Sequence, residues 1–312
     1  MVNYNGLFNL LKNKGITKSQ LSKNLGLSST TIAKLSKGEH ISMKVLENLC
    51  NYLNCNLNEI VSFEKEKSLS NILAILKEEK QMRLKGGLYH QTQIKLTYNS
   101  NHIEGSRLTE EQTRYIYETN TLGVESDSSV NVDDIIETTN HFKCIDYIID
   151  NAENELSEDI IKELHSILKS STSDSNKDWF AVGDYKKKPN IVGDMPTTSP
   201  AKVPTEINKL LSSYNHLPQK SLNDIISFHH DFESIHPFQD GNGRVGRLIM
   251  FEECLKNNIV PFIIDEELKL FYYRGLKEWK NEKGYLTDTC LLAQDKYKKI
   301  LDYFKIDYSS SK

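Results

Sequence analysis

The side chains that could do chemistry are concentrated in twelve consecutive residues, His236-Pro237-Phe238-Gln239-Asp240-Gly241-Asn242-Gly243-Arg244-Val245-Gly246-Arg247. An imidazole can accept a proton from a hydroxyl near neutral pH. A carboxylate supplies the oxygen ligands that Mg²⁺ prefers, and guanidinium groups bind phosphate oxygens through planar sets of donors. Together these residue types indicate a site that handles phosphate.

The spacing within residues 236–247 supports this interpretation. Gly241-Asn242-Gly243 can adopt backbone angles that are closed to residues with a Cβ, so successive N–H groups can converge on one anion. We expect a helix to start next and to direct its positive dipole end at the same anion. Arg244 and Arg247 lie three positions apart, hence on one face of that helix. Asp240 is placed to hold a Mg²⁺ ion that bridges the phosphates.

The segment before the loop must position the histidine. Apolar residues recur at helical spacing between Leu222 and Ile235, which predicts a helix docked on a core. Pro237 disfavours continuation of that helix, so His236 falls at the helix end and faces the loop. We expect Phe238 to anchor the loop by burial.

Further elements follow from the same periodicity, and they predict an all-α fold with one small β-hairpin. The Lys/Glu-rich segment 64–96 predicts a single connecting helix, and residues 121–132 are polar enough to be a loop. Glycines and prolines within roughly residues 183–200 predict a short hairpin flap. The other predicted helices are Thr109–Asn120, Asp133–Asn151, Ser157–Lys169, Pro204–Tyr214 and Arg244–Asn257.

The first 63 residues predict a separate bundle of short helices. Thr17 and Gln20 form a capping-box pattern at the start of one helix, and Ser28 caps the next, which ends at Gly38. Residues 4–62 resemble the Cro/C1-type helix-turn-helix family, in which the second helix reads DNA. The side chains expected to contact DNA are Ser28, Ser29, Thr30, Thr31, Lys34 and Lys37.

Charge and composition agree with this division. Residues 1–63 hold seven lysines against three glutamates, a net charge of +4, whereas the whole chain of 312 residues carries −4. A basic head on an acidic body indicates that only the head meets an anionic polymer, although the head lacks arginine, the commonest reader of guanine. The five cysteines form no C-x-x-C pair, so we expect buried free thiols. Neither a membrane-spanning run nor a secretion signal is evident, so we expect a cytoplasmic protein without membrane partners.

The motif His-x-Phe-x-Asp-Gly-Asn-Gly-Arg-x-x-Arg at 236–247 resembles the active-site motif of the Fic family at every position. That family is all-helical and moves nucleotide monophosphates, most often AMP from ATP with Mg²⁺, onto Tyr, Ser or Thr hydroxyls of proteins. The resemblance extends over roughly residues 90–300. It implies that His236 deprotonates the target hydroxyl and that Asp240 binds Mg²⁺ on the α- and β-phosphates.

The resemblance also assigns the nucleotide contacts. Arg244 and Arg247 would hold the β- and γ-phosphates, and the intact second glycine and second arginine resemble AMP transferases rather than the kinase-like branch. The implied nucleotide-binding residues are Asp240, Gly241, Asn242, Gly243, Arg244, Val245, Gly246 and Arg247, with the glycine turn as anion hole. Val192-Gly193-Asp194-Met195 resembles the hairpin that covers the nucleotide, and Tyr272-Tyr273 the pair that lines the adenine pocket, although core packing explains these tyrosines equally well.

Ser100-Asn101-His102-Ile103-Glu104-Gly105 matches the family's inhibitory motif, Ser/Thr-x-x-x-Glu-Gly/Asn. A glutamate against Arg247 would occupy donors that the γ-phosphate needs. The resemblance therefore implies that Glu104 inhibits transfer, within an inhibitory helix at roughly residues 97–107. The same carboxylate is a candidate for positioning water in the removal of AMP.

Two other functions stay open. His229-His230-Asp231 with His236 and Asp240 could form a metal-dependent phosphohydrolase, but this leaves the glycines and arginines without a role. Alternatively the chain is a transcriptional regulator or antidote in which the residues after the helix-turn-helix domain serve as a sensor and not as an enzyme. Its partner would then be its own operator DNA, and it would act as a homodimer. A P-loop ATPase is not indicated, because the P-loop motif does not occur.

These observations predict four parts. Residues 1–63 form the helix-turn-helix domain, 64–96 the connecting helix, 97–300 the Fic domain and 301–312 a tail.

Overall fold

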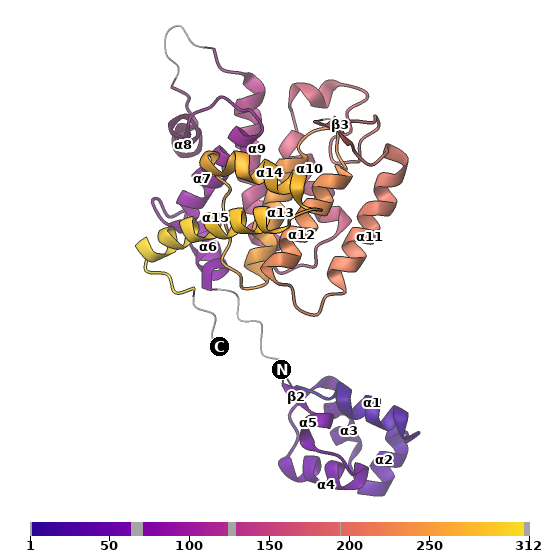
Figure 1. Cartoon of the computed structure of the whole chain (residues 1–312). Helices are drawn as coiled ribbons and strands as arrows, with labels where there is room; N and C mark the ends of the chain where they lie inside the picture. The colour runs from indigo at the N-terminus through magenta and orange to yellow at the C-terminus, as the bar shows by residue number, and fades with distance from the viewer. Residues whose placement is uncertain (1, 64–70, 124–128, 194, 309–312) are drawn as a thin grey trace. The chain divides into compact units, whose positions relative to one another are not determined.

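The computed structural model describes residues 2–63, 71–123, 129–193 and 195–308. The chain divides into two compact units, Met1–Ser68 and Leu69–Lys312, which we call the N-terminal and C-terminal units (Figure 1). None of the described helices combines the length and apolar character needed to cross a bilayer.

The N-terminal unit is a bundle of five short helices closed by a two-stranded sheet. The hydroxyl of Thr17 and the side chain of Gln20 form a capping box at the start of the second helix, which ends at Gly26 in the left-handed region. Leu21 and Leu49 lie in its buried apolar core. The elements are β1 (Val2–Asn3), α1 (Asn5–Asn13), α2 (Lys18–Leu25), α3 (Ser29–Lys37), α4 (Met43–Leu53), α5 (Leu57–Ile60) and β2 (Ser62–Phe63), with β1 antiparallel to β2.

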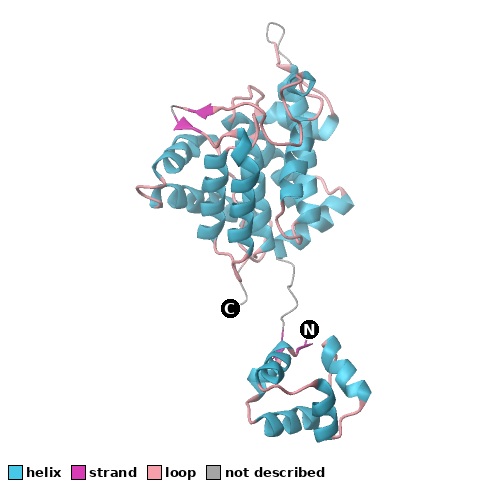
Figure 2. Cartoon of the chain, turned by 90° about the vertical axis from the view of Figure 1, so that its right-hand side faces the viewer, coloured by secondary structure: helices cyan, strands magenta, loops and turns pink. Residues whose placement is uncertain are grey.

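Apart from one short hairpin, the regular secondary structure described in the C-terminal unit is helical, which confirms the predicted all-α class (Figure 2). Its long helices are α6 (Asn71–Met82), α7 (Leu88–Ile103), α8 (Glu110–Thr119), α9 (Val132–Asn151), α10 (Glu158–Lys169), α11 (Val203–Asn215), α12 (Leu222–Ile235), α13 (Asn242–Lys256), α14 (Lys269–Glu278) and α15 (Gly284–Tyr303). Three 3₁₀ turns (Ser173–Asn176, Pro200–Lys202, Glu266–Leu268) and one hairpin of β3 (Ile191–Val192) and β4 (Met195–Pro196) complete it.

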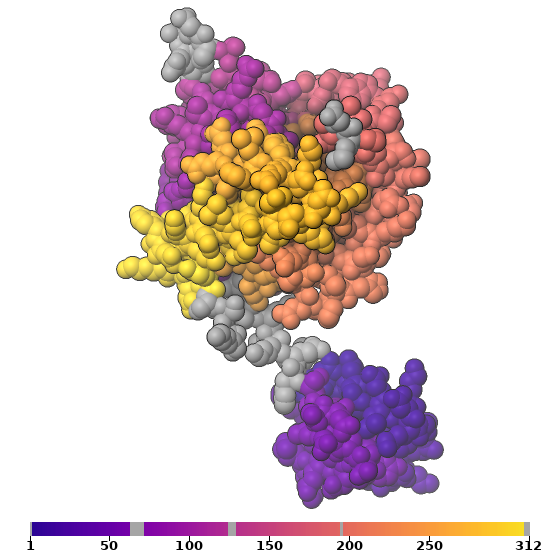
Figure 3. All heavy atoms as spheres, viewed as in Figure 1, coloured from indigo at the N-terminus to yellow at the C-terminus, as the bar shows by residue number. Residues whose placement is uncertain are grey.

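Helix α13 is the centre of this unit. Every residue from Asn242 to Leu255 is buried, and the helix packs against α7, α9, α10 and α12. A helix that is covered on all sides belongs to the interior of a domain. By contrast, α14 and α15 form much of one outer face (Figure 3). The loop that enters α13 is therefore held by several helices rather than lying on a surface.

The prediction of one connecting helix over 64–96 is wrong where the structure describes it. Helix α6 ends at Met82 and α7 begins at Leu88, with Gly86 at a φ of 77° between them. Gly86 suits this left-handed turn, and a Cβ on Gly87 would lie 2.5 Å from a carboxylate oxygen of Glu79 and would displace the carboxylate that accepts the N–H of Tyr89. Residues 64–70 lie outside the described residues.

Three smaller expectations also change. The inhibitory helix is the last part of α7, which ends at Ile103, so Glu104 is its C-cap. Within 121–132 the described residues are loop except Val132, which begins α9. All five cysteines are free thiols, but only Cys144, Cys254 and Cys290 are buried, and Cys50 and Cys55 are partly exposed.

Candidate active site

The catalytic loop is closed by one side-chain amide. His236 ends α12 in the left-handed region with a φ of 53°, which turns the chain away from the helix. Phe238 is completely buried. Its backbone N–H donates to Asn242 Oδ1 over 2.8 Å, and Asn242 Nδ2 donates back to its carbonyl over 2.9 Å. The amide of Asn242 thus holds the loop shut, a role that the glycine-turn interpretation had missed.

The two positions of the turn, Gly241 and Gly243, favour glycine for different reasons. Gly241 is the N-cap of α13 with a φ of 84°, a conformation that favours glycine. Gly243 lies within the first turn of α13, where a Cβ would be 2.1 Å from Glu104 Oε1. Only Gly241 therefore needs unusual backbone angles, and Gly243 leaves space for a carboxylate. Val245 faces the core, and Gly246 packs on the side chains of α12.

The imidazole of His236 is partly exposed and neutral at pH 7. Burial, together with the nearby ammonium of Lys186, lowers its pKa to about 4. Nδ1 is the buried nitrogen, so Nε2 is the one available for a proton. Lys186 is itself buried, and its ammonium donates to Asn190 and Thr197 over 2.8 and 2.6 Å. Its backbone N–H donates to the carbonyl of Pro237 over 2.9 Å, so Lys186 ties the base of the hairpin to the loop.

Asp240 is held by two cations. Lys169 Nζ and Arg244 Nη2 lie 2.7 and 3.1 Å from its Oδ2. Burial alone would raise the pKa of this carboxyl, but Arg244 and Lys169 lower it far below its usual value. Arg244 also pairs with Glu137, so the guanidinium is engaged by two carboxylates rather than free for a phosphate.

Arg247 is engaged by the end of α7. Its Nη2 donates to Glu104 Oε1 and to the carbonyl of Ser100, both over 2.8 Å, and its Nε donates to Ser100 Oγ over 3.1 Å. Among the described residues Nη1 has no partner, although it is buried. Gly105 follows with a φ of 101°. The structure therefore brings Ser100 and Glu104 against Arg247, and the carboxylate lies over Gly243.

The hairpin presents apolar side chains to solvent. Val192 pairs with Met195 across the turn at Gly193, and Ile191 and Val192 are 69% and 51% exposed. Asp194 lies outside the described residues. An exposed apolar pair on a two-stranded hairpin has backbone groups free to pair with a further strand.

The two tyrosines of α14 have different surroundings. Tyr272 is 1% exposed, and its hydroxyl lies 2.7 Å from His229 Nε2. Tyr273 is 41% exposed and donates to the carbonyl of Ile103 over 3.1 Å, at the end of α7. Only Tyr273 is open to a ligand in this structure, while Tyr272 packs beside Arg247, whose guanidinium carbon is 5.8 Å from its ring centre.

Comparison with known proteins agrees with this geometry. Residues 155–253 match the Fic/DOC family, and residues 7–66 match the Cro/C1-type HTH DNA-binding domain. The C-terminal unit carries a Fic domain.

Curated relatives of the Fic domain are called protein adenylyltransferase Fic. Those of Nematostella vectensis and Drosophila melanogaster are each 28% identical to this chain over 189 and 183 residues, 58% of this chain in both cases. The matched parts are 42% and 36% of those relatives, so the chain spans less than half the length of either.

Solved structures share the fold. A Fic domain containing signaling protein from Bacteroides thetaiotaomicron has a TM-score of 0.59 at 20% identity, covering 78% of this chain and all of that one. Fic-1 from C. elegans has a TM-score of 0.59 at 19% identity, covering 77% of this chain and 72% of that one. At these identities the likeness concerns the fold alone.

The Fic domain offers no protein-only metal site. Among the residues that the structure describes, no three His, Cys, Asp or Glu side chains are grouped to hold an ion. His229 is turned to Tyr272, and His230 pairs with Asp231 over 2.9 Å, so the phosphohydrolase alternative lacks its cluster. Asp240 has one carboxylate oxygen not committed to the two cations, which fits a Mg²⁺ ion whose other ligands come from phosphates.

Several residues around the loop were missed by sequence reasoning. The omitted side chains are Glu137 on α9, His165 and Lys169 on α10, Lys186 before the hairpin and Glu233 on α12. Burial raises the pKa of Glu233 to about 8, and Glu104 contributes. His165 and Lys169 are one helical turn apart, and this spacing can be read from the sequence. The neighbouring residues give no sign that this face of α10 packs against the loop.

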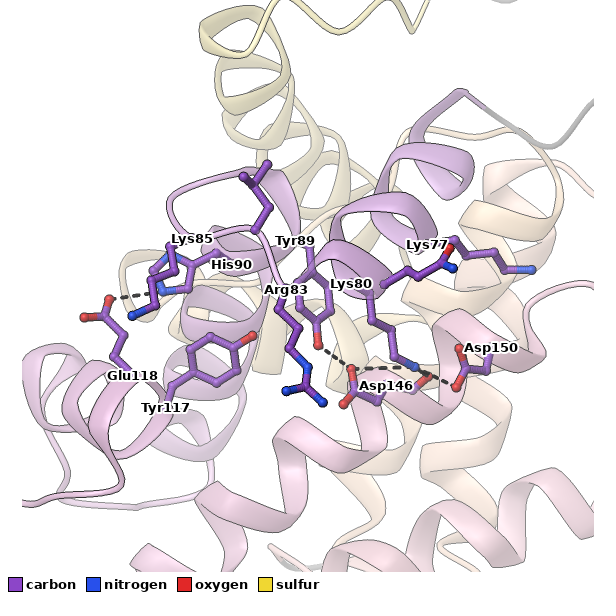
Figure 4. A pocket seen from close by; sticks show the side chains of 12 residues that line it. Lys77, Lys80, Arg83, Lys85, Tyr89, His90, Tyr117, Glu118, Asp146 and Asp150 are labelled. Carbon is purple, nitrogen blue, oxygen red and sulfur yellow. Dashed lines mark hydrogen bonds and ion pairs between the residues drawn. The ribbon is translucent and has the colours of Figure 1, made fainter.

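A cavity of about 880 Å³ lies apart from residues 236–247 (Figure 4). It is lined by α6, the turn after it, α7, α8 and α9. Lys80 donates to Asp150 over 2.6 Å and Tyr89 to Asp146 over 2.5 Å, so its polar groups are largely paired with α9. None of residues 236–247 lines this cavity.

In the N-terminal unit, the predicted DNA-contacting residues lie on or next to α3. Ser29, Thr30, Lys34 and Lys37 are exposed. Ser28 caps α3 by accepting the backbone N–H of Thr31, so its hydroxyl is partly committed to the helix. The hydroxyl of Thr30 lies 2.7 Å from that of Ser28, so the exposed side chains of Ser29, Lys34 and Lys37 are the more available ones for a phosphate.

Proposed function

We propose that this chain is a protein adenylyltransferase that moves AMP from ATP onto a Tyr, Ser or Thr hydroxyl of a target protein, and that Glu104 inhibits it. The observation that carries the proposal is the loop itself. A complete His-x-Phe-x-Asp-Gly-Asn-Gly-Arg-x-x-Arg motif enters a buried helix and has a neutral imidazole at its start. The names of the curated relatives support the same reaction.

The chemistry follows from the positions of the groups. The target hydroxyl gives its proton to Nε2 of His236 as its oxygen attacks the α-phosphorus. The bond from that phosphorus to the bridging oxygen breaks, and pyrophosphate leaves. Mg²⁺ on Asp240 would neutralise charge on the phosphates. Backbone N–H groups at the start of α13 and the donors of Arg247 would hold the phosphate oxygens.

Inhibition follows from competition for one guanidinium. Glu104 occupies Nη2 of Arg247 and the space above Gly243, where a phosphate would have to lie. ATP would then bind with its terminal phosphates displaced, and the α-phosphorus would be out of line for attack. With Glu104 in place, the same carboxylate could orient water for the reverse removal of AMP.

The test uses ATP labelled at its α-phosphate. Glu104→Gly should raise labelling of the protein itself or of a lysate protein by at least about tenfold over the unchanged chain, because the phosphate contacts become available. His236→Ala in the Glu104→Gly background should remove labelling while the protein stays folded. Labelling that persists without His236 would refute the proposed base.

A second function rests on the N-terminal unit. We propose that its exposed α3 binds DNA, most simply the DNA upstream of its own coding sequence, and that a dimer recognises two half-sites. The match of residues 7–66 to a DNA-binding domain supports this. The two functions are compatible in one chain.

A further inference from the structure

Three carboxylates converge on the side chain of one buried lysine next to the catalytic loop. Lys169, the last residue of α10, is 2% exposed. Its ammonium nitrogen lies 2.5 Å from Glu137 Oε1, 2.7 Å from Asp240 Oδ2 and 3.1 Å from Asp174 Oδ2. The ammonium is therefore surrounded by carboxylate oxygens, which are the ligands that a hard divalent cation takes. Their distances here are those of hydrogen-bonded ion pairs.

Helix α10 also fixes the backbone of the same residue. His165 lies one turn before Lys169, stacks flat on Phe238 at 3.9 Å, and has its Nε2 3.2 Å from the carbonyl of Asp240. The N–H of Gly183 donates to Nδ1 over 3.0 Å, so the ring proton is on Nε2 and is donated to that carbonyl. Asp240 is therefore held by α10 through both its backbone and its side chain.

We propose that the ammonium of Lys169 acts as a permanent cation in this carboxylate cluster, so that a divalent ion binds Asp240 only together with a nucleotide. Lys169 and Arg244 both occupy Oδ2 of Asp240, which leaves a metal one oxygen of that carboxylate. Glu137 and Asp174 are kept from acting as further ligands because they neutralise Lys169. This inference rests on the proposed metal-binding role of Asp240.

Electrostatics predicts the direction in which removal of the ammonium changes the affinity for a divalent ion. The cluster holds three carboxylates against the buried cations Lys169 and Arg244 and the exposed Lys177, so removal of Lys169 leaves one carboxylate charge in excess. Without Lys169, three oxygens would face an empty position. The Glu137 oxygen already lies within the ligand distance of Ca²⁺, and those of Asp240 and Asp174 would need to close in by about 0.1 and 0.5 Å. Loss of a positive charge and gain of ligands both favour a divalent ion. A lysine with a purely structural role would produce only a less stable protein when replaced.

The experiment measures Mn²⁺ binding to the full chain by electron paramagnetic resonance, without nucleotide. The unchanged protein should bind no Mn²⁺ at about 1 mM, whereas Lys169→Met should bind it at least about tenfold more tightly. Lys169→Arg keeps the charge and should behave as the unchanged protein. Lys177→Met is the matched control, because Lys177 also pairs with Asp174, over 2.6 Å, but is exposed and does not touch Asp240.

Two results would overturn the inference. One is a folded Lys169→Met protein that binds Mn²⁺ no more tightly than the unchanged chain. The other needs no variant: nucleotide-free binding by the unchanged protein as tight as in the presence of a non-hydrolysable ATP analogue. Failure of the adenylyltransferase proposal would appear separately, as absent labelling by Glu104→Gly, since the Mn²⁺ measurement requires no AMP transfer.

Discussion

The protonation state of His236 is set by its surroundings rather than by its residue type. A solvated histidine is half-protonated near pH 6.5. Here burial lowers the pKa to about 4, and Lys186 acts in the same direction. Because the folded-state pKa is depressed, the imidazole is neutral throughout the range above about pH 5. A base that is already neutral can accept the proton of a hydroxyl without first losing one.

This gives a prediction for the pH dependence of transfer. For the Glu104→Gly protein, lowering the pH from 7 to 6 should change the labelling rate by less than about twofold, because a group with a pKa of about 4 stays neutral. An unperturbed histidine would lose about threefold over the same interval. Glu104 raises the pKa of His236, so its removal can only strengthen the effect. Initial labelling rates at saturating ATP and Mg²⁺ measure this, and an acid limb centred near pH 6.5 would contradict it.

Gly243 gives a prediction of coupling between two residues. A methyl at Gly243 would lie 2.1 Å from Glu104 Oε1, so Gly243→Ala should destabilise the unchanged protein by about 2 kcal/mol through overcrowding. In the Glu104→Gly background the loss should be smaller by at least about 1 kcal/mol, since the nearest atom is gone. Unfolding of the C-terminal unit can be followed by tryptophan fluorescence, because Trp179 and Trp279 both lie in it. Additive effects of the two substitutions would show that Glu104 does not occupy this position.

At the scale of elements, the end of α7 supplies several hydrogen-bond acceptors to Arg247 at once. The hydroxyl and carbonyl of Ser100 and the carboxylate of Glu104 all accept from the same guanidinium. The hydroxyl of Tyr273 and the ammonium of Lys269 on α14 reach carbonyls at the end of α7. Release of the proposed inhibition would therefore require the end of α7 to move or Glu104 to rotate away.

A substitution in α7 that spares Glu104 should release part of the inhibition. Ser100→Ala removes one hydrogen bond to Arg247, worth about 1 kcal/mol, and should raise labelling roughly fivefold, less than Glu104→Gly. The control is Asn99→Ala, because the Asn99 amide donates to the carbonyl of Lys95 and makes no contact with Arg247. Equal labelling by both variants would mean that Ser100 has no part in holding the guanidinium.

The comparison of sequence and structure shows which elements were predictable. Helices with their own caps and apolar stripes, such as α12 with its Ser221–Asp224 capping box, have local causes and were located correctly. The break between α6 and α7 was missed because the charged residues around Gly86 suit a helix, and one glycine pair decided against it. Glu137 and Lys169 are 32 residues apart, and only the packing of α9 on α10 makes them neighbours of the loop. Such long-range pairs have no signature in a single sequence.

At the scale of the whole molecule, each unit has its own core. Leu7, Leu21, Leu35 and Leu49 are buried within the N-terminal unit, while α13 and the helices around it form the core of the C-terminal unit. Units with separate cores are expected to fold and function separately. Binding of DNA and transfer of AMP should then depend on different sets of side chains.

We predict that DNA binding and AMP transfer can be abolished independently by substitutions in the two units. Lys34→Ala with Lys37→Ala should weaken binding to upstream DNA and lower the dependence of log affinity on log salt by roughly two, because two phosphate contacts are lost. In the Glu104→Gly background, labelling with ATP should stay unchanged. His236→Ala should have the opposite pattern, with DNA binding retained and labelling lost.

Lys44→Ala serves as the control for charge alone. Lys44 lies on α4, where it pairs with Glu47 over 3.1 Å, so its loss removes one positive charge without touching α3. Because the electrostatic attraction of a basic unit for DNA is summed over all its charges, this variant should reduce affinity slightly for every sequence. The α3 variant should weaken binding more strongly and lower the salt dependence further, because it loses two phosphate contacts on the helix that faces DNA. A gel shift that responds equally to both changes would mean that α3 is not the element that contacts DNA, and the basic N-terminal unit would then have to attract DNA through its overall charge.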